Sequence, residues 1–278
     1  MFLMFFTSCK TLKITGEYLD NPPSVVPKVA LSTDLNRNNW QHLDPINDSV
    51  PGMSVDKAYT ELIKDSEGQT VVVAVLDTGI DIKHEDLKGN IWTNKKEIPG
   101  NNIDDDKNGF VDDVYGWNFL GEAYYEQLEL TRLLGKGEDF PEKEDAQKDY
   151  DKRLAEARGE ETLKYYLNYD FKGRKTGDDP DNFEQTYYGD NKVEHSREDE
   201  SHGTHVAGII AAARNNNLGM KGVANNVEIM TLRVVPYGDE YDKDVALGII
   251  YAADNGADII NTSFGKGFSP HSDKVRDC

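Results

Sequence analysis

The feature that most constrains the fold is a continuous run of β-branched and other apolar residues from Thr70 to Leu76. A run of this kind is typical of a strand that is buried on both faces of a parallel sheet. The sequence Asp77-Thr78-Gly79 follows at once, and its polar and glycine residues mark the carboxyl edge of that sheet. Because open α/β sheets bind their ligands at this edge, Asp77 is a first candidate for a functional residue.

Other apolar segments alternate between helical and extended patterns. We expect a helix at Ser54–Asp65, with Ser54 as its N-cap, because its apolar residues fall on one helical face. Further along the chain we expect a buried helix at 206–213, a strand at 227–235, an amphipathic helix at 242–255 and a buried strand at 257–264. This alternation predicts an α/β fold, a three-layer α/β/α sandwich with a mostly parallel sheet.

The remaining segments lack such periodicity. Residues 10–50 are rich in Asn, Pro and Asp and are interpreted as an extended linker that precedes a domain at 51–278. An acidic insertion at about 120–200 carries many charges and few apolar anchors. That pattern predicts solvated helices and loops rather than a second core.

The charge balance limits the kinds of partner. The chain has 31 Lys and Arg residues against 51 Asp and Glu residues, for a formal net charge of −20. A field of this sign repels phosphate backbones, so nucleic acid is not expected as a partner. The same field suits divalent cations.

The N-terminus points to export. Met1 to Phe6 is apolar, and Thr7, Ser8 and Cys9 follow. This pattern resembles the end of a bacterial lipoprotein signal, although it lacks a basic n-region and its apolar core is short; an arbitrary hydrophobic start is the alternative. Residues 1–9 are thus interpreted as a signal remnant. A lipid on Cys9 would be the only membrane link, and we expect a cell-envelope lipoprotein or an extracellular protein.

Two sets of residues have the chemistry of a catalytic site, but neither is specific alone. Asp77 at a strand end could be a helix cap, a metal ligand or a catalytic acid. In the sequence His202-Gly203-Thr204-His205, two histidines three residues apart could bind a metal, or His205 could be a packing residue.

Longer strings resolve this ambiguity. Val71–Asp81, followed by His84–Leu87, resembles the segment around the catalytic Asp of the subtilisin family. Ser201–Ala212 is similar to the family's His segment throughout, and Gly222–Ala224 and Ile259–Gly265 resemble later landmarks in the same order. The chain is therefore identified as a member of the subtilisin-like serine protease family, of which it resembles the N-terminal two-thirds.

The resemblance implies a serine endopeptidase with an Asp-His-Ser triad. Asp77 matches the buried carboxylate that orients the imidazole, and His202 matches the general base. His205 is then interpreted as a structural histidine. A metallohydrolase that uses Asp77, His202 and His205 is a rival interpretation.

The resemblance also implies a polypeptide substrate that binds as an extended strand. Ser263, Phe264 and Gly265 match one wall of the primary specificity pocket. Tyr237 and Gly238 fall where the family pairs with the substrate backbone.

The chain departs from the family in what it lacks. Neither the Gly-Thr-Ser-Met-Ala segment of the nucleophile nor the oxyanion Asn is found, so the domain is expected to be incomplete at its C-terminal side. Without these groups no acyl-enzyme can form, and we expect this chain alone to be inactive. The alternative is a non-catalytic, calcium-binding pseudopeptidase that binds extended peptides.

A structural Ca²⁺ ion is expected from two loops. Asp104, Asp106, Asn108 and Asp112 occupy positions 1, 3, 5 and 9 of a partial calcium loop, in which Tyr115 replaces the usual Glu at position 12. The second candidate is Asn216, in a segment that resembles the calcium loop after the His helix of subtilisins.

Overall fold

The computed structural model describes residues 37–64, 68–195, 197 and 199–278. The chain divides into two compact units, Met1–Lys64 and Asp65–Cys278. The α/β unit therefore begins at Asp65 and not at the predicted residue 51. The predicted signal remnant and Cys9 lie outside the described residues.

In the described part of the first unit, residues 44–54 fold around the carboxylate of Asp44. This carboxylate accepts hydrogen bonds from the amide of Asn47, the hydroxyl of Ser54 and the amide of Ile46. These bonds lower the pKa of Asp44 to about 2. Together with the 3-10 helix η1 (Trp40–His42), they give residues 37–50 a folded structure in place of the expected extended linker.

The helix expected at Ser54–Asp65 is present as α2 (Val55–Ala58), which continues as the π-helix η2 (Tyr59–Ile63). Ser54 does not cap it with its side chain, because the hydroxyl donates to Asp44. Neither segment has a buried residue, so within the described residues 37–64 the apolar stripe of this helix has no core behind it.

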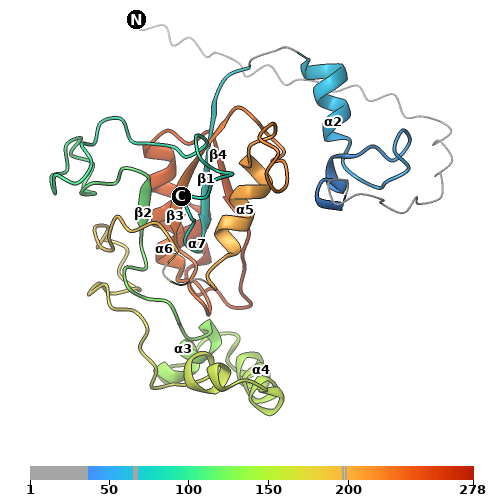
Figure 1. The fold of residues 1–278 in the computed structure, drawn as a ribbon. Helices are drawn as coiled ribbons and strands as arrows, with labels where there is room; N and C mark the ends of the chain where they lie inside the picture. Colours follow the sequence, from blue (N-terminus) through green and yellow to red (C-terminus); the bar gives the residue numbers. More distant parts are fainter. Residues whose placement is uncertain (1–36, 65–67, 196, 198) are drawn as a thin grey trace, which may run out of the picture. The chain divides into compact units, whose positions relative to one another are not determined.

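The second unit contains a four-stranded parallel sheet in the order β2-β3-β1-β4 (Figure 1). The strands are β1 (Val71–Asp77), β2 (Gly116–Asn118), β3 (Val227–Arg233) and β4 (Ile259–Thr262). β1 pairs with β3 from Val71 opposite Val227 to Asp77 opposite Arg233, and with β4 up to Leu76 opposite Thr262. The three strands thus end at one level, so the residues that follow them share one edge of the sheet.

Helices cover both faces of the sheet. Alternate residues of β1 point to opposite faces, and because these residues are apolar, each face packs against a helix. Val73 and Val75 belong to a core cluster with Val206 and Ala207 of α5 (His202–Ala211). Ala74 and Leu76 belong to the other cluster, with residues of α6 (Asp242–Asp254) such as Tyr251. The predicted α/β architecture with a parallel sheet is confirmed.

The acidic insertion has a small core of its own, contrary to the sequence analysis. It contains α3 (Glu129–Lys136), α4 (Lys143–Glu156) and the π-helix η3 (Thr162–Tyr166). Figure 1 shows α3 and α4 packed together away from the sheet. Their shared cluster consists of Leu130, Ala146, Tyr150 and Leu167.

Buried ion pairs connect the insertion to α6. The guanidinium of Arg174 binds Asp178 within the insertion and Asp244 of α6, at 2.8 and 2.7 Å. Lys243 of α6 also binds Asp178, at 2.7 Å. The last described helix, α7 (Ser272–Arg276), follows β4 and packs against α6.

Candidate active site

Asp77 is fully buried as the last residue of β1. Its Oδ1 accepts a hydrogen bond from the amide of Thr78 at 2.7 Å. Its backbone carbonyl accepts from the amides of Val234 and Val235, which follow β3. Backbone contacts on two strands therefore hold this carboxylate in place at the edge of the sheet.

His202 is the first residue of α5, and its Nδ1 lies 2.7 Å from Oδ1 of Asp77. The histidine side chain is 55% exposed, whereas the carboxylate is inaccessible. Gly203 fixes the start of the helix against the Asp77 turn: its amide donates to Oγ1 of Thr78 at 2.9 Å. A Cβ atom at this glycine would lie only 2.5 Å from the carbonyl oxygen of Thr78.

This pair can perform acid–base chemistry. A carboxylate at Nδ1 holds the proton on that nitrogen, which leaves Nε2 as the base. Because Asp77 is shielded and the ring is open, a substrate can reach the imidazole but not the carboxylate. His205, one turn further along α5, is exposed. In the described part of the chain, Asp77, His202 and His205 do not form a group that could hold a metal ion.

Ser263, Phe264 and Gly265 directly follow β4 and so lie at the same edge as Asp77. Phe264 packs against the main core cluster, whereas Ser263 and Gly265 are exposed. The loops after β3 and β4 flank the end of β1, since these two strands are its neighbours in the sheet.

In the loop after β3, both backbone polar groups of Tyr237 are hydrogen-bonded to the insertion. The amide of Tyr237 donates to the carbonyl of Tyr124, and its carbonyl accepts from the amide of Glu126, both at 2.7 Å. Next to it, a Cβ atom at Gly238 would lie 2.2 Å from the carbonyl oxygen of Glu126. The predicted substrate-pairing segment is thus paired with the insertion through Tyr237.

An aromatic cluster surrounds this contact. The rings of Tyr124 and Tyr237 stack at 4.7 Å, and those of Tyr125 and Tyr165 stack at 4.0 Å. The hydroxyl of Tyr237 donates to the carbonyl of Asp199, three residues before His202. The insertion therefore contributes aromatic surface close to the start of α5.

Comparison with known proteins identifies the family. The model described as the Subtilase family matches residues 68–277. The chain belongs to the subtilase family.

Individual subtilases resemble the chain over different lengths. Subtilisin-like protease 1 of Plasmodium falciparum (isolate 3D7) is 27% identical over 209 residues, 73% of this chain and 20% of that protein. The cell wall-associated protease of Bacillus subtilis (strain 168) is 46% identical over 72 residues, 26% of this chain and 8% of the relative. The thermophilic serine proteinase of Bacillus sp. (strain AK1) is 50% identical over 66 residues, 23% of this chain and 16% of the relative. The chain spans a fifth or less of each relative.

The acidic loop of this subtilase brings together only part of the predicted calcium set. Carboxylate oxygens of Asp104, Asp106 and Glu97 all lie within 4.8 Å of one another. Glu97 is buried, and this burial raises its pKa. Glu97 was not among the predicted ligands, because it lies seven residues before the loop that it joins.

Asn108 and Asp112 have other partners. The amide nitrogen of Asn108 donates to Asp113, whose pKa is raised by burial. The carboxylate of Asp112 accepts hydrogen bonds from the amides of Gly100, Asn101 and Asn102 and so closes a neighbouring turn.

Asn216, predicted as a ligand of the second calcium loop, contacts the carboxylate of Asp86, which was not among the predicted ligands. Its amide nitrogen donates to Oδ1 of the buried Asp86 at 2.7 Å, and its amide oxygen accepts from the amide of Leu218. Asp86 lies nine positions after Asp77, and only the folded loop brings it to Asn216.

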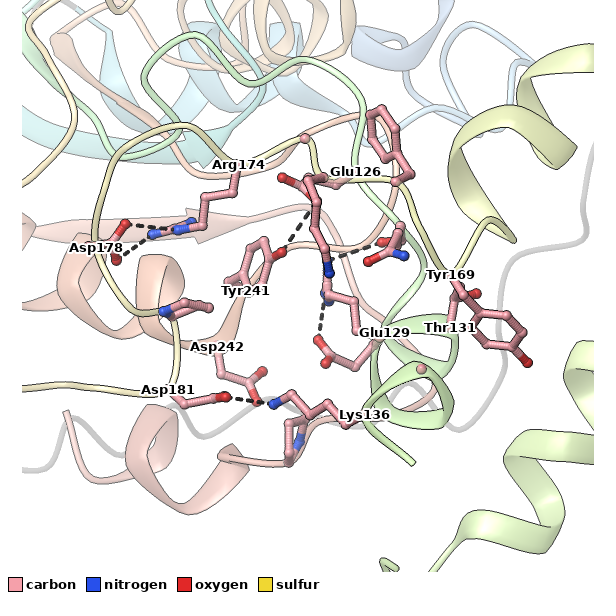
Figure 2. A pocket seen from close by; sticks show the side chains of 18 of the residues that line it. Glu126, Glu129, Thr131, Lys136, Tyr169, Arg174, Asp178, Asp181, Tyr241 and Asp242 are labelled. Atoms are coloured by element: carbon pink, nitrogen blue, oxygen red, sulfur yellow. Dashed lines mark hydrogen bonds and ion pairs between the residues drawn. The ribbon is translucent and has the colours of Figure 1, made fainter. Parts of the chain in front are cut away.

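A cavity of about 600 Å³ lies between the insertion and the start of α6, and neither Asp77 nor His202 lines it (Figure 2). Figure 2 shows Arg174 facing Asp178 on one side and Lys136 facing Asp181 on another. Buried Glu129, which also lines the cavity, binds Arg132 at 2.6 Å. Much of the charge on the walls is thus compensated within the protein.

In the described residues no helix has the length and apolar character of a membrane span.

Proposed function

We propose that this subtilase chain supplies the acid–base pair of a serine endopeptidase. The 2.7 Å contact between Nδ1 of His202 and Oδ1 of Asp77 is the observation that supports it most directly. In the reaction, Nε2 of His202 takes the proton of a serine hydroxyl and later returns it to the leaving amine. Asp77 orients the ring and stabilises the imidazolium that forms in between.

The nucleophile is a separate part of the proposal. A Gly-Thr-Ser-Met-Ala segment does not occur in the 278 residues. Without an activated serine the acid–base pair has no proton to transfer, so we propose that these residues alone do not hydrolyse peptides.

For the substrate we propose an extended polypeptide that binds across the carboxyl edge of the sheet. The segment Ser263, Phe264 and Gly265 on one side and the Tyr124–Tyr237 stack on the other flank the end of β1. A peptide between them passes over His202. Because the backbone of Tyr237 is already paired, this residue contributes its ring, whereas the exposed loop after β4 offers its backbone.

The test combines labelling and hydrolysis. Purified 278-residue chain is treated with a fluorophosphonate probe and with fluorescent casein, and neither labelling nor hydrolysis is expected. Labelling of the chain would contradict its proposed inactivity. The genomic sequence beyond the codon for Cys278 is then searched for a segment that encodes Gly-Thr-Ser-Met-Ala. If one is found, it is fused in frame to the 278-residue chain, and the fusion is expressed.

The joined protein is expected to hydrolyse casein. Asp77→Asn should lower the rate about 10⁴-fold, because the wrong tautomer of His202 is then favoured. Hydrolysis that survives both Asp77→Asn and His202→Ala would contradict the acid–base role. If no nucleophile segment follows the chain, the non-catalytic peptide-binding alternative replaces the proposal.

We also propose a structural Ca²⁺ ion held by Glu97, Asp104 and Asp106. Three carboxylates at this spacing repel one another, and Ca²⁺ prefers oxygen ligands of this kind. The ion would supply positive charge and would hold the loop closed; it has no step in peptide hydrolysis. Asp86 with Asn216 forms a second, smaller candidate site.

An exported location remains part of the proposal. The name of one relative, cell wall-associated protease, supports it. Mass spectrometry of the protein from membranes of its host tests the lipid on Cys9, and an unmodified cysteine would contradict the lipoprotein interpretation.

A further inference from the structure

Glu200 holds together the two segments that carry Asp77 and His202. It is buried, and its Oε1 accepts a hydrogen bond from the amide of Gly79 at 2.7 Å. Gly79 lies two residues after Asp77, and Glu200 lies two residues before His202. One carboxylate oxygen therefore connects the turn after β1 to the segment that leads into α5.

The same oxygen is bound to Arg233. The Nε atom of this arginine lies 2.8 Å from Oε1 of Glu200, and both side chains are almost completely buried. Arg233 is the last residue of β3 and pairs with Asp77 in the sheet register. The carboxylate is thus attached to β3 as well as to the end of β1.

The other nitrogens of Arg233 reach the segment where the insertion begins. Nη1 donates to Oδ1 of Asn118 at 3.2 Å and to the carbonyl of Gly121 at 3.1 Å, and Nη2 donates to the carbonyl of Ala123 at 2.9 Å. Glu200 stands at the point where the insertion returns to the core. A single buried ion pair therefore fastens both ends of a long acidic insertion beside the Asp77–His202 pair.

We propose that Glu200, held by Arg233, is a positioning residue for the Asp77–His202 pair. The role rests on the proposed function, because it concerns the geometry of the acid–base pair. A charged carboxylate is needed for two reasons. It compensates a buried guanidinium, and it accepts the Gly79 amide, a charge-assisted bond that is stronger than a neutral one.

Removal of Glu200 has a specific consequence. The amide of Gly79 and the guanidinium of Arg233 would both lose a buried partner, and the turn after Asp77 could then move relative to α5. Small displacements break the 2.7 Å contact between Asp77 and His202, because a hydrogen bond weakens steeply with distance and angle. The positioning effect is therefore visible at the imidazole, without any substrate.

The test is proton NMR of the 278-residue chain. The proton on Nδ1 of His202, bonded to the buried Asp77 carboxylate, should give a resolved downfield resonance, and Asp77→Asn assigns it by its disappearance. In Glu200→Ala the signal should be lost. In Glu200→Gln it should persist but broaden, because the glutamine oxygen still accepts from Gly79. If Glu200→Ala does not fold, the broadening of this resonance in Glu200→Gln provides the test.

Asp178→Asn is the matched control. This substitution breaks the buried ion pair between Asp178 and Arg174, where the insertion meets α6. It should lower the melting temperature but leave the Nδ1 proton resonance of His202 intact. An unchanged signal in Glu200→Ala overturns the proposal, as does an equal loss in both Glu200→Ala and Asp178→Asn, which would show a merely structural role. A signal that is absent from the wild-type chain contradicts the Asp77–His202 pair itself, so failure of the proposed function is distinguishable from failure of the positioning role.

Discussion

At the scale of single residues, the contact between α5 and the turn after β1 depends on a glycine beside the candidate base. A Cβ atom at Gly203 would meet the carbonyl oxygen of Thr78 at 2.5 Å, whereas a Cβ atom at Gly208 on the same helix would meet nothing within 4 Å. The two glycines lie on the same helix but have different structural roles. One permits close packing near His202, and the other only lowers helix stability.

Alanine substitutions should separate these roles. Gly203→Ala is expected to lower the free energy of unfolding by about 1–3 kcal/mol, since helix and turn must move apart. Gly208→Ala should instead raise it by about 0.5–1 kcal/mol, because alanine restricts the unfolded chain. Thermal unfolding followed by circular dichroism measures both. Equal effects of the two substitutions would contradict the close packing described for Gly203.

The calcium proposal is also tested at residue scale. Ca²⁺ at 100 times its Kd should stabilise the wild-type chain by about 2.7 kcal/mol, and Glu97→Gln and Asp106→Asn should reduce this gain. Asp145→Asn, which removes an exposed carboxylate of α4, is the control and should leave it unchanged. Melting temperatures with Ca²⁺ or with a chelator provide the measurement. A Ca²⁺ effect that Glu97→Gln does not alter would contradict the ligand set.

At the scale of elements, buried ion pairs join the insertion to α6. Although burial opposes it, hydrogen bonds from Arg174 and Lys243 lower the pKa of Asp178 to about 2, from an ordinary value of 3.8. The folded protein therefore binds this proton less tightly than the unfolded chain does. The resulting stability is fully present above pH 4 and is lost as the pH falls towards 2.

Acid titration should show this contribution. Between pH 4 and pH 2 the free energy of unfolding should fall by about 2 kcal/mol because of Asp178 alone. Asp178→Asn should start from a lower value at pH 7 and show a shallower slope in this window. Denaturant unfolding at several pH values measures both quantities. Asp145→Asn should keep the wild-type slope, and an identical slope in Asp178→Asn would contradict the assignment.

At the scale of the whole molecule, the sheet formed by the described residues exposes apolar side chains on one edge strand. β4 is the edge strand, and Ile259 on it is 54% exposed. Edge strands of this kind pair with other chains unless charges or a covering element prevent it. Exposed Ile250 on α6 adds further apolar surface in the same unit.

At high concentration the 278-residue chain is therefore expected to self-associate through β4. Ile259→Lys should shift sedimentation profiles towards the monomer, because a charged side chain on an edge strand disfavours pairing between chains. Leu163→Lys removes a similarly exposed leucine, at 52%, that lies in η3 and away from the sheet; it should have little effect. Equal effects of both substitutions would indicate general apolar adhesion instead of edge pairing.

Local patterns in the sequence were sufficient for the central elements of the fold. β1, β3, α5 and α6 were predicted because burial of a strand on both faces leaves a continuous apolar run, and a helix beside a sheet leaves a repeating stripe. The strand β4 was predicted as well, but its predicted burial is wrong: its residues are exposed or half-buried because β4 lies at the edge of the sheet. The three-residue β2 was missed, since so short a strand has no period. The small core of the insertion was missed for a similar reason: its four residues are spread between positions 130 and 167.

For the site, the sequence by itself determined which residues are candidates for acid–base chemistry, because Asp77 and His202 lie in long sequence segments that occur in a characteristic order. Only the tertiary structure decided what else reaches them. Glu200 meets Gly79 and Arg233 across 121 and 33 positions of sequence, and Glu97 reaches a loop that starts seven residues later. Such contacts leave no local pattern, because a buried polar group needs only one partner in space and that partner can come from anywhere along the chain.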